Sequence, residues 1–151
     1  MKRFLLWLLL AGVSFADPTF HIGGAVGHAH DWTCRQVRET LAGQVKTVYY
    51  DYRGAHHSAA CVPLWAVLEG AAPQGKSLDD TVVVEGTDGY QVTFSLGELD
   101  PKFGNEPVWL ALDEDGAPLP EALSPTRLII PGDVKLGRWV HNVVRLRVVA
   151  R

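Results

Sequence analysis

The stretch TVVVEGTDGYQVTFSLGEL, residues 81–99, has the pattern of a β-hairpin followed directly by a short helix. Its two runs are rich in β-branched and aromatic residues and flank an Asp88-Gly89 pair, a strong hairpin signal because glycine accepts the backbone angles of a tight turn. Ser95 is followed three residues later by Glu98, the spacing of a capping box. The stretch therefore predicts two antiparallel strands that lead into a capped helix.

Strand and helix patterns alternate through the rest of the chain. Valine-rich or alternating runs predict strands, and leucine or valine at helical spacing predicts helices, the first of them capped by Asp31 or Thr33. Expected strands lie in residues 20–28, 45–54, 107–120, 126–133 and 139–149, and expected helices in 31–41 and 62–72. This order predicts one α+β domain over residues 19–150, with a mixed β-sheet and a few short helices.

The first 16 residues have the organisation of a secretory signal peptide. Lys2 and Arg3 precede the apolar run FLLWLLLAGV, and small residues stand at Ser14 and Ala16, where a signal peptidase cleaves. We therefore expect a signal peptide at residues 1–16 and an exported protein, periplasmic or secreted. The apolar run is shorter than the roughly 20 residues of a spanning helix, so no stable membrane span is expected after cleavage.

Composition limits the classes of partner. Hydrophobic residues make up 47% of the chain and charged residues 21%, which is enough apolar material for a packed core. The formal net charge is −3 at pH 7, and loss of Lys2 and Arg3 with the leader makes it more negative. A nucleic-acid partner is therefore not expected, nor is a polybasic membrane contact.

Two cysteines, Cys34 and Cys61, follow the predicted leader. An isolated pair in an oxidising compartment favours a disulfide, and we expect Cys34 and Cys61 to form one. In the alternative, Cys61 remains a thiolate and binds a soft metal.

Four histidines form two close pairs, His28 with His30 and His56 with His57, each in a predicted loop. Neutral imidazole is a common ligand of copper and zinc. No third ligand follows at a diagnostic spacing, so metal binding and simple exposure both remain open.

Basic residues gather late in the chain, within PGDVKLGRWVHNVV at residues 131–144. Lys135, Arg138 and His141 accompany Trp139 on a glycine-punctuated approach to a strand. This set predicts either a pocket for an anionic cofactor or the solvated rim of a terminal strand.

Four segments together carry a family resemblance. In chain order they are FHIGGAVGHAHDWT, CVPLWAVLEGA, VVVEGTDGYQVTFSLGELDP and TRLIIPGDVKLGRWVHNVVRLRVV. They resemble the oxidoreductase molybdopterin-binding domain of sulfite oxidase-like enzymes, in particular its short exported members, over nearly all of residues 19–150. The resemblance implies a sulfite oxidase-like fold. In full-length relatives it implies a pterin whose dithiolene holds molybdenum, completed by a cysteine thiolate.

The resemblance also implies roles for individual residues. The segment from Lys135 to Trp139 would lie against the pterin and its phosphate, where Lys135 and Arg138 could donate charge-assisted hydrogen bonds. Lys135, Arg138, Trp139 and His141 are therefore the candidate cofactor-binding residues. The chain departs from full-length enzymes in lacking a C-x-G-N loop, and Cys61 stands directly before the VPLW segment.

Two functions follow from this comparison. The favoured one is an exported, non-catalytic binding or accessory module that holds a pterin or another small anion. The alternative is a small molybdopterin-dependent oxidoreductase with Cys61 as the molybdenum ligand. Its catalytic residues, substrate and protein partner are not predicted by any motif.

Overall fold

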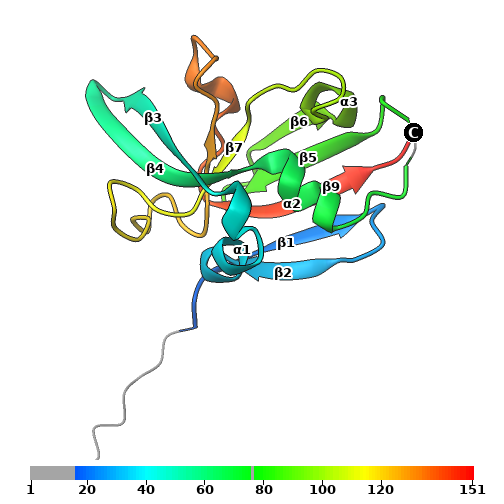
Figure 1. The fold of residues 1–151 in the computed structure, drawn as a ribbon, viewed down its shortest axis with the longest axis horizontal. Helices are drawn as coiled ribbons and strands as arrows, with labels where there is room; N and C mark the ends of the chain where they lie inside the picture. Colours follow the sequence, from blue (N-terminus) through cyan, green and yellow to red (C-terminus); the bar gives the residue numbers. More distant parts are fainter. Residues whose placement is uncertain (1–15, 76) are drawn as a thin grey trace, which may run out of the picture.

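The computed structural model describes residues 16–75 and 77–151 and shows a single α+β domain with few helices (Figure 1). The expected signal peptide, apart from Ala16, lies outside the described residues. The α+β class and a mixed sheet are confirmed, but the strands divide between two sheets, and only one of them is mixed.

The first sheet has five strands in the order β2-β1-β9-β5-β6. Their bounds are β1 Thr19–Gly24, β2 His30–Thr33, β5 Thr81–Gly86, β6 Gln91–Ser95 and β9 Val143–Val149. The first and last strands, β1 and β9, pair in parallel, whereas the other pairs are antiparallel. The sheet is therefore mixed, and its central strand comes from the end of the chain.

The predicted hairpin and its helix are confirmed. Strands β5 and β6 pair antiparallel, with Gly89 at a φ of 81° in the turn and the Tyr90 amide donating to the Asp88 carboxylate at 3.0 Å. Helix α3 (Leu96–Leu99) begins with the predicted capping box, in which Ser95 and Glu98 each accept a hydrogen bond from the other's backbone amide. Local sequence signals thus determine this part of the fold.

The second sheet has four strands in the order β3-β4-β7-β8, all antiparallel. Their bounds are β3 Lys46–Tyr52, β4 Ala55–Pro63, β7 Trp109–Ala111 and β8 Leu128–Ile129. The sequence did not predict strand β4. His56 and His57 lie in this strand, whereas they were expected in a loop. Figure 1 shows the β3–β4 hairpin projecting away from the five-stranded sheet.

The remaining helical segments are short. They are α1 (Cys34–Thr40), η1 (Ala42–Gln44), α2 (Leu64–Gly70) and η2 (Leu136–Arg138). Thr33 caps α1 by accepting from the Gln36 amide at 3.1 Å, whereas Asp31, the other expected cap, belongs to β2. Within the part of the chain that the structure describes, no helix has the length and apolarity to cross a membrane.

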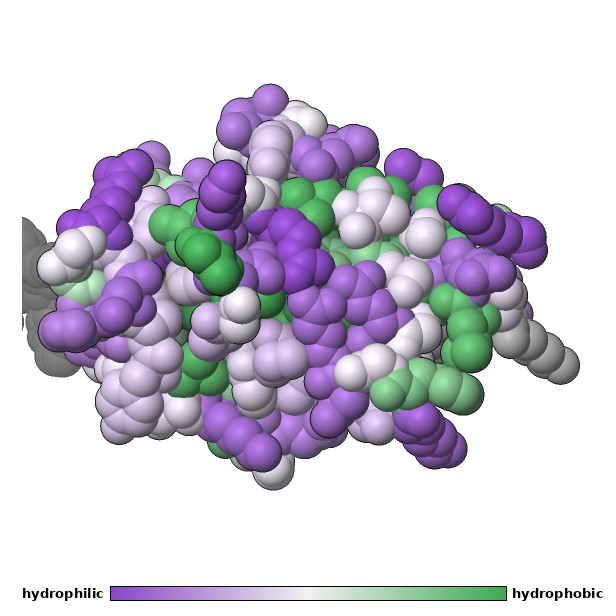
Figure 2. Space-filling view, turned by 90° about the horizontal axis from the view of Figure 1, so that it is seen from above, coloured by the Kyte–Doolittle hydropathy of each residue, from purple (hydrophilic) through white to green (hydrophobic). Residues whose placement is uncertain are grey.

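One continuous hydrophobic core joins the sheets and helices. Buried side chains meet in register across the five-stranded sheet, where Leu146 pairs with both Ile22 and Val84. The second sheet and α2 contribute fully buried residues to the same core, including Val62, Leu64, Leu68 and Leu110. On the face shown in Figure 2, apolar side chains are scattered among polar ones.

We predict that Leu146→Ala lowers the free energy of unfolding by about 2–5 kcal/mol, because it leaves a cavity in the central strand of a closed core. Its neighbour Arg147 is exposed on the other face of β9, so Arg147→Ala is expected to change stability by no more than about 0.5 kcal/mol. Urea unfolding of both variants measures the difference. Equal losses would contradict the assigned register.

Candidate functional site

Arg138, the central basic residue of the predicted pocket, is already paired with three carboxylates. Its guanidinium donates to Asp133 at 2.6 and 2.9 Å, to Glu98 at 3.0 Å and to Glu106. The hydrogen bonds to Asp133 have the largest effect and that to Glu106 the next largest, and together they raise the pKa of Arg138. Arg138 thus joins η2 to α3, and its charge is neutralised within the protein.

The other predicted cofactor-binding residues separate into different environments. Lys135 is exposed at the start of η2. Trp139 is buried, and its indole N–H donates to the Ile130 carbonyl at 3.1 Å. The half-buried His141 packs its ring 5.6 Å from that of Tyr52. Burial, followed by the charge of a nearby arginine, Arg127, lowers the pKa of His141.

The two cysteines are both free thiols, so the structure does not contain the expected Cys34–Cys61 disulfide. Cys34 instead donates to the Pro125 carbonyl at 3.0 Å, while Cys61 is fully enclosed in β4. Burial raises the pKa of Cys34 to about 11 and that of Cys61 to about 12. Cys61 is enclosed and lines none of the three hollows given below, so its thiol does not face a space that could hold a pterin-bound metal. The described residues therefore do not fit a pterin-bound molybdenum with Cys61 as its ligand.

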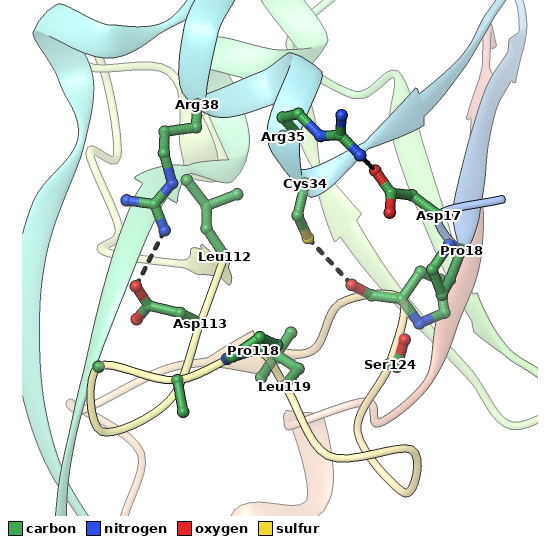
Figure 3. A pocket seen from close by; sticks show the side chains of 13 residues that line it. Asp17, Pro18, Cys34, Arg35, Arg38, Leu112, Asp113, Pro118, Leu119 and Ser124 are labelled. Carbon is green, nitrogen blue, oxygen red and sulfur yellow. Dashed lines mark hydrogen bonds and ion pairs between the residues drawn. The ribbon is translucent and has the colours of Figure 1, made fainter. Parts of the chain in front are cut away.

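A surface hollow of about 470 Å³ lies beside Cys34 (Figure 3). Two arginines of α1 border it, but each faces a carboxylate: Arg35 pairs with Asp17, and Arg38 donates to Asp113 at 2.9 Å. Much of the remaining wall is apolar. The positive charges of both arginines are thus compensated by carboxylates, so neither arginine gives the hollow a preference for an anion.

Arg127, directly before β8, is the most unusual charged group of the described chain. Its side chain is fully buried, and none of its three guanidinium nitrogens has a hydrogen-bond partner among the described residues. The nearest carboxylate oxygen is that of Glu114, at 3.5 Å from Nη1. We call Arg127, Glu114 and the rings of Tyr50, Tyr52 and Trp139 the Arg127 cluster.

Three aromatic rings surround the guanidinium. Its central carbon lies 4.6 Å from the ring centre of Tyr52 and 5.6 Å from those of Tyr50 and Trp139. Cation–π contacts of this kind stabilise the charge, but they accept none of the five N–H donors directed in the guanidinium plane. The cluster therefore offers charge compensation without hydrogen-bond compensation.

Burial without acceptors is expensive for a guanidinium. Burial lowers the pKa of Arg127, while the nearby Tyr50 and Glu114 act in the opposite direction. A buried charge is stable only when it is paired and its polar atoms are hydrogen-bonded. An oxyanion, with several acceptor oxygens and a negative charge, supplies what Arg127 lacks.

Rings of the Arg127 cluster also form walls of two surface hollows. Tyr50 and Trp139 line one of about 460 Å³, between β3 and residues 131–136. Trp139 and His141 line another of about 360 Å³. Tyr50 and Trp139 thus contact the guanidinium and also line these surface hollows.

Tyr50 connects the cluster to a second set of polar residues. Its hydroxyl donates to Glu114 at 2.6 Å, and its ring stacks 5.6 Å from that of His57. Burial, together with the hydrogen bond to Glu114, raises the pKa of Tyr50 above its usual range. Tyr50 is thus a protonated donor that holds Glu114 beside Arg127.

The sequence analysis missed the centre of this site. Trp139 and His141, which were singled out, do lie at Arg127, but TRLIIPGD was treated as a strand and as part of the family resemblance, with no role for Arg127. A usable signal was present, because Arg127 is one charge between Thr126 and the apolar run Leu128–Ile130. A charged residue in a strand that is buried on both faces needs a partner or a ligand.

No protein-family model matches this chain, and no curated protein is significantly similar to it. The candidate site therefore depends on geometry and charge alone.

We predict that Cys61 resists alkylation in the folded protein, because it is enclosed and its thiol stays protonated near neutral pH. Peptide mapping after iodoacetamide treatment measures this, with and without guanidinium chloride and with and without reductant. Both cysteines should be alkylated once the protein unfolds. Labelling that requires a reductant would reveal a disulfide, and rapid labelling of native Cys61 would restore it as a candidate ligand.

Proposed function

We propose that this chain is an exported, non-catalytic binding module for a small oxyanion, and that Arg127 is its anion-binding residue. The observation that carries the proposal is the fully buried guanidinium, whose three nitrogens have no hydrogen-bond partner among the described residues. A guanidinium presents paired donors in a plane that match two oxygens of a sulfate, sulfite or phosphate group. The anion would complete the Arg127 cluster.

The proposed anion site lies in the region that the sequence indicated, but it is centred on Arg127 and not on Arg138. Trp139 and His141 remain beside the anion, whereas Arg138 is withdrawn because three carboxylates hold it. Lys135, exposed near the hollow that Leu136 lines, is left as a peripheral charge. A small anion is favoured over a pterin, because Arg127 is fully buried and lines none of the hollows described above.

The alternative of a molybdenum oxidoreductase has weaker support. It needs Cys61 as a thiolate that faces a pocket, but this thiol is enclosed and its pKa is raised to about 12. None of the hollows described above is lined by Cys61. The non-catalytic module requires no role for this residue beyond packing.

We predict that sulfate, sulfite or phosphate raises the melting temperature of the wild-type chain relative to chloride at equal ionic strength. Binding to the folded state alone stabilises it by about 2.7 kcal/mol at an anion concentration of about 100 times Kd. Arg127→Met should abolish the saturable response, while Lys135→Gln should keep it. Differential scanning calorimetry measures all three proteins.

Arg127→Met serves as a test protein once its folding is shown. Replacing the buried cation by an apolar side chain of similar length removes the cost of burying its charge but also its ion pair with Glu114, so a cooperative melting transition of the anion-free variant is established first. Loss of the response therefore cannot be attributed to unfolding. A response retained in Arg127→Met but lost in Lys135→Gln would place the anion on the 131–138 loop instead. A wild-type chain without any saturable response would refute the binding module.

A further inference from the structure

Three potential metal ligands meet on the outer side of the Arg127 cluster. They are His57 of β4 and two consecutive acidic residues after β7, Glu114 and Asp115. One nitrogen or oxygen of each lies within 4.8 Å of the others. Neither the expected His56–His57 pairing nor the anion site accounts for this arrangement.

The backbone holds the two acidic residues against β4. Glu114 and Ala117 exchange backbone hydrogen bonds of 2.9 and 3.0 Å around a tight turn, in which Asp115 and Gly116 have positive φ. The Asp115 amide donates to the Ser58 carbonyl at 2.7 Å, and the Ser58 amide donates to the Asp115 carboxylate at 2.9 Å. The turn is thus tied to the residue that follows His57.

The side chains are oriented but retain acceptor capacity. A ring nitrogen of His57, Nδ1, lies 2.7 Å from Asp115 Oδ2, which leaves the other nitrogen of the ring for another partner. Glu114 accepts from the Tyr50 hydroxyl through Oε1, and its second oxygen has no such bond among the described residues. Because Nδ1 and the Asp115 carboxylate already face each other, an ion held by both would lie between them and replace this contact.

We propose that His57, Glu114 and Asp115 form a site for one divalent transition-metal ion of the zinc or copper type. Imidazole nitrogen with carboxylate oxygen suits these ions, whereas magnesium and calcium prefer oxygen alone. Bonds of about 2.0–2.2 Å place the ligands of one ion at most about 4.4 Å apart, so the trio needs to contract only slightly. Water completes the coordination. The proposal does not rest on anion binding, although both sites include Glu114.

Nearby charges determine how strongly the ion is held. Asp113, the residue before Glu114, adds a carboxylate but is paired with Arg38 at 2.9 Å. Arg127 lies 3.5 Å from Glu114 and repels a cation bound there. Replacing Arg127 by methionine should therefore strengthen metal binding, the opposite of its effect on anion binding.

Zinc titration by calorimetry in a non-coordinating buffer tests the site. We expect one ion per wild-type chain with a dissociation constant in the micromolar range. His57→Ala and Asp115→Asn should each weaken binding at least tenfold, and Arg127→Met should tighten it. His56→Ala is the matched control, because His56 is 95% exposed and pairs with Asp51 instead. Its affinity should remain within twofold of the wild type.

Two results would overturn the proposal. One is a wild-type chain that binds no zinc or copper in the micromolar range. The other is unchanged affinity in His57→Ala with binding lost in His28→Ala or His30→Ala, which would place the ion at the other histidine pair. Circular dichroism of each variant, taken before titration, ensures that a loss of binding reports on ligands and not on folding.

Discussion

The burial of one guanidinium constrains four separate segments of this fold. Arg127 itself precedes β8, Tyr50 and Tyr52 come from β3, Trp139 follows η2, and Glu114 follows β7. Each segment must approach closely enough to offset the loss of water around a positive charge. Segments of the second sheet and the chain that follows η2 therefore converge on Arg127.

The chain stabilises two arginines in opposite ways, and this contrast is the reason for placing the proposed anion site at Arg127. Arg138 is partly exposed and is bound by three carboxylates, so its charge and its donors are both satisfied. Arg127 is fully buried and has aromatic neighbours, with one carboxylate at 3.5 Å. Only the second retains unmet hydrogen-bonding capacity, and only the second has a reason to attract a ligand. The His57 trio shares Glu114 with this cluster, so charge bound at either place is felt at the other.

Local patterns in the sequence predicted the local structure well. The Asp88-Gly89 turn and the Ser95–Glu98 box act within a few residues, and both are present in the structure. Strand β4 was missed because AHHSAACVP, residues 55–63, has little of the alternation that marks a half-buried strand, and it is ordered by pairing with β3 and β7. The division into two sheets likewise depends on long-range pairing. The sequence predicted a pocket that included Arg138. The carboxylates of Asp133, Glu98 and Glu106 reach Arg138 only in the folded chain, so no local pattern indicated that its charge was already paired.

The central claim is that an oxyanion binds at the buried guanidinium of Arg127. The most direct measurement is the ¹H–¹⁵N spectrum of arginine Nε groups during titration with sulfate, with Arg127→Met used to assign the resonance. The account predicts a saturable shift of the Arg127 resonance and an unmoved Arg138 resonance, because three carboxylates already hold Arg138. A saturable shift of Arg138 with Arg127 unchanged would contradict it.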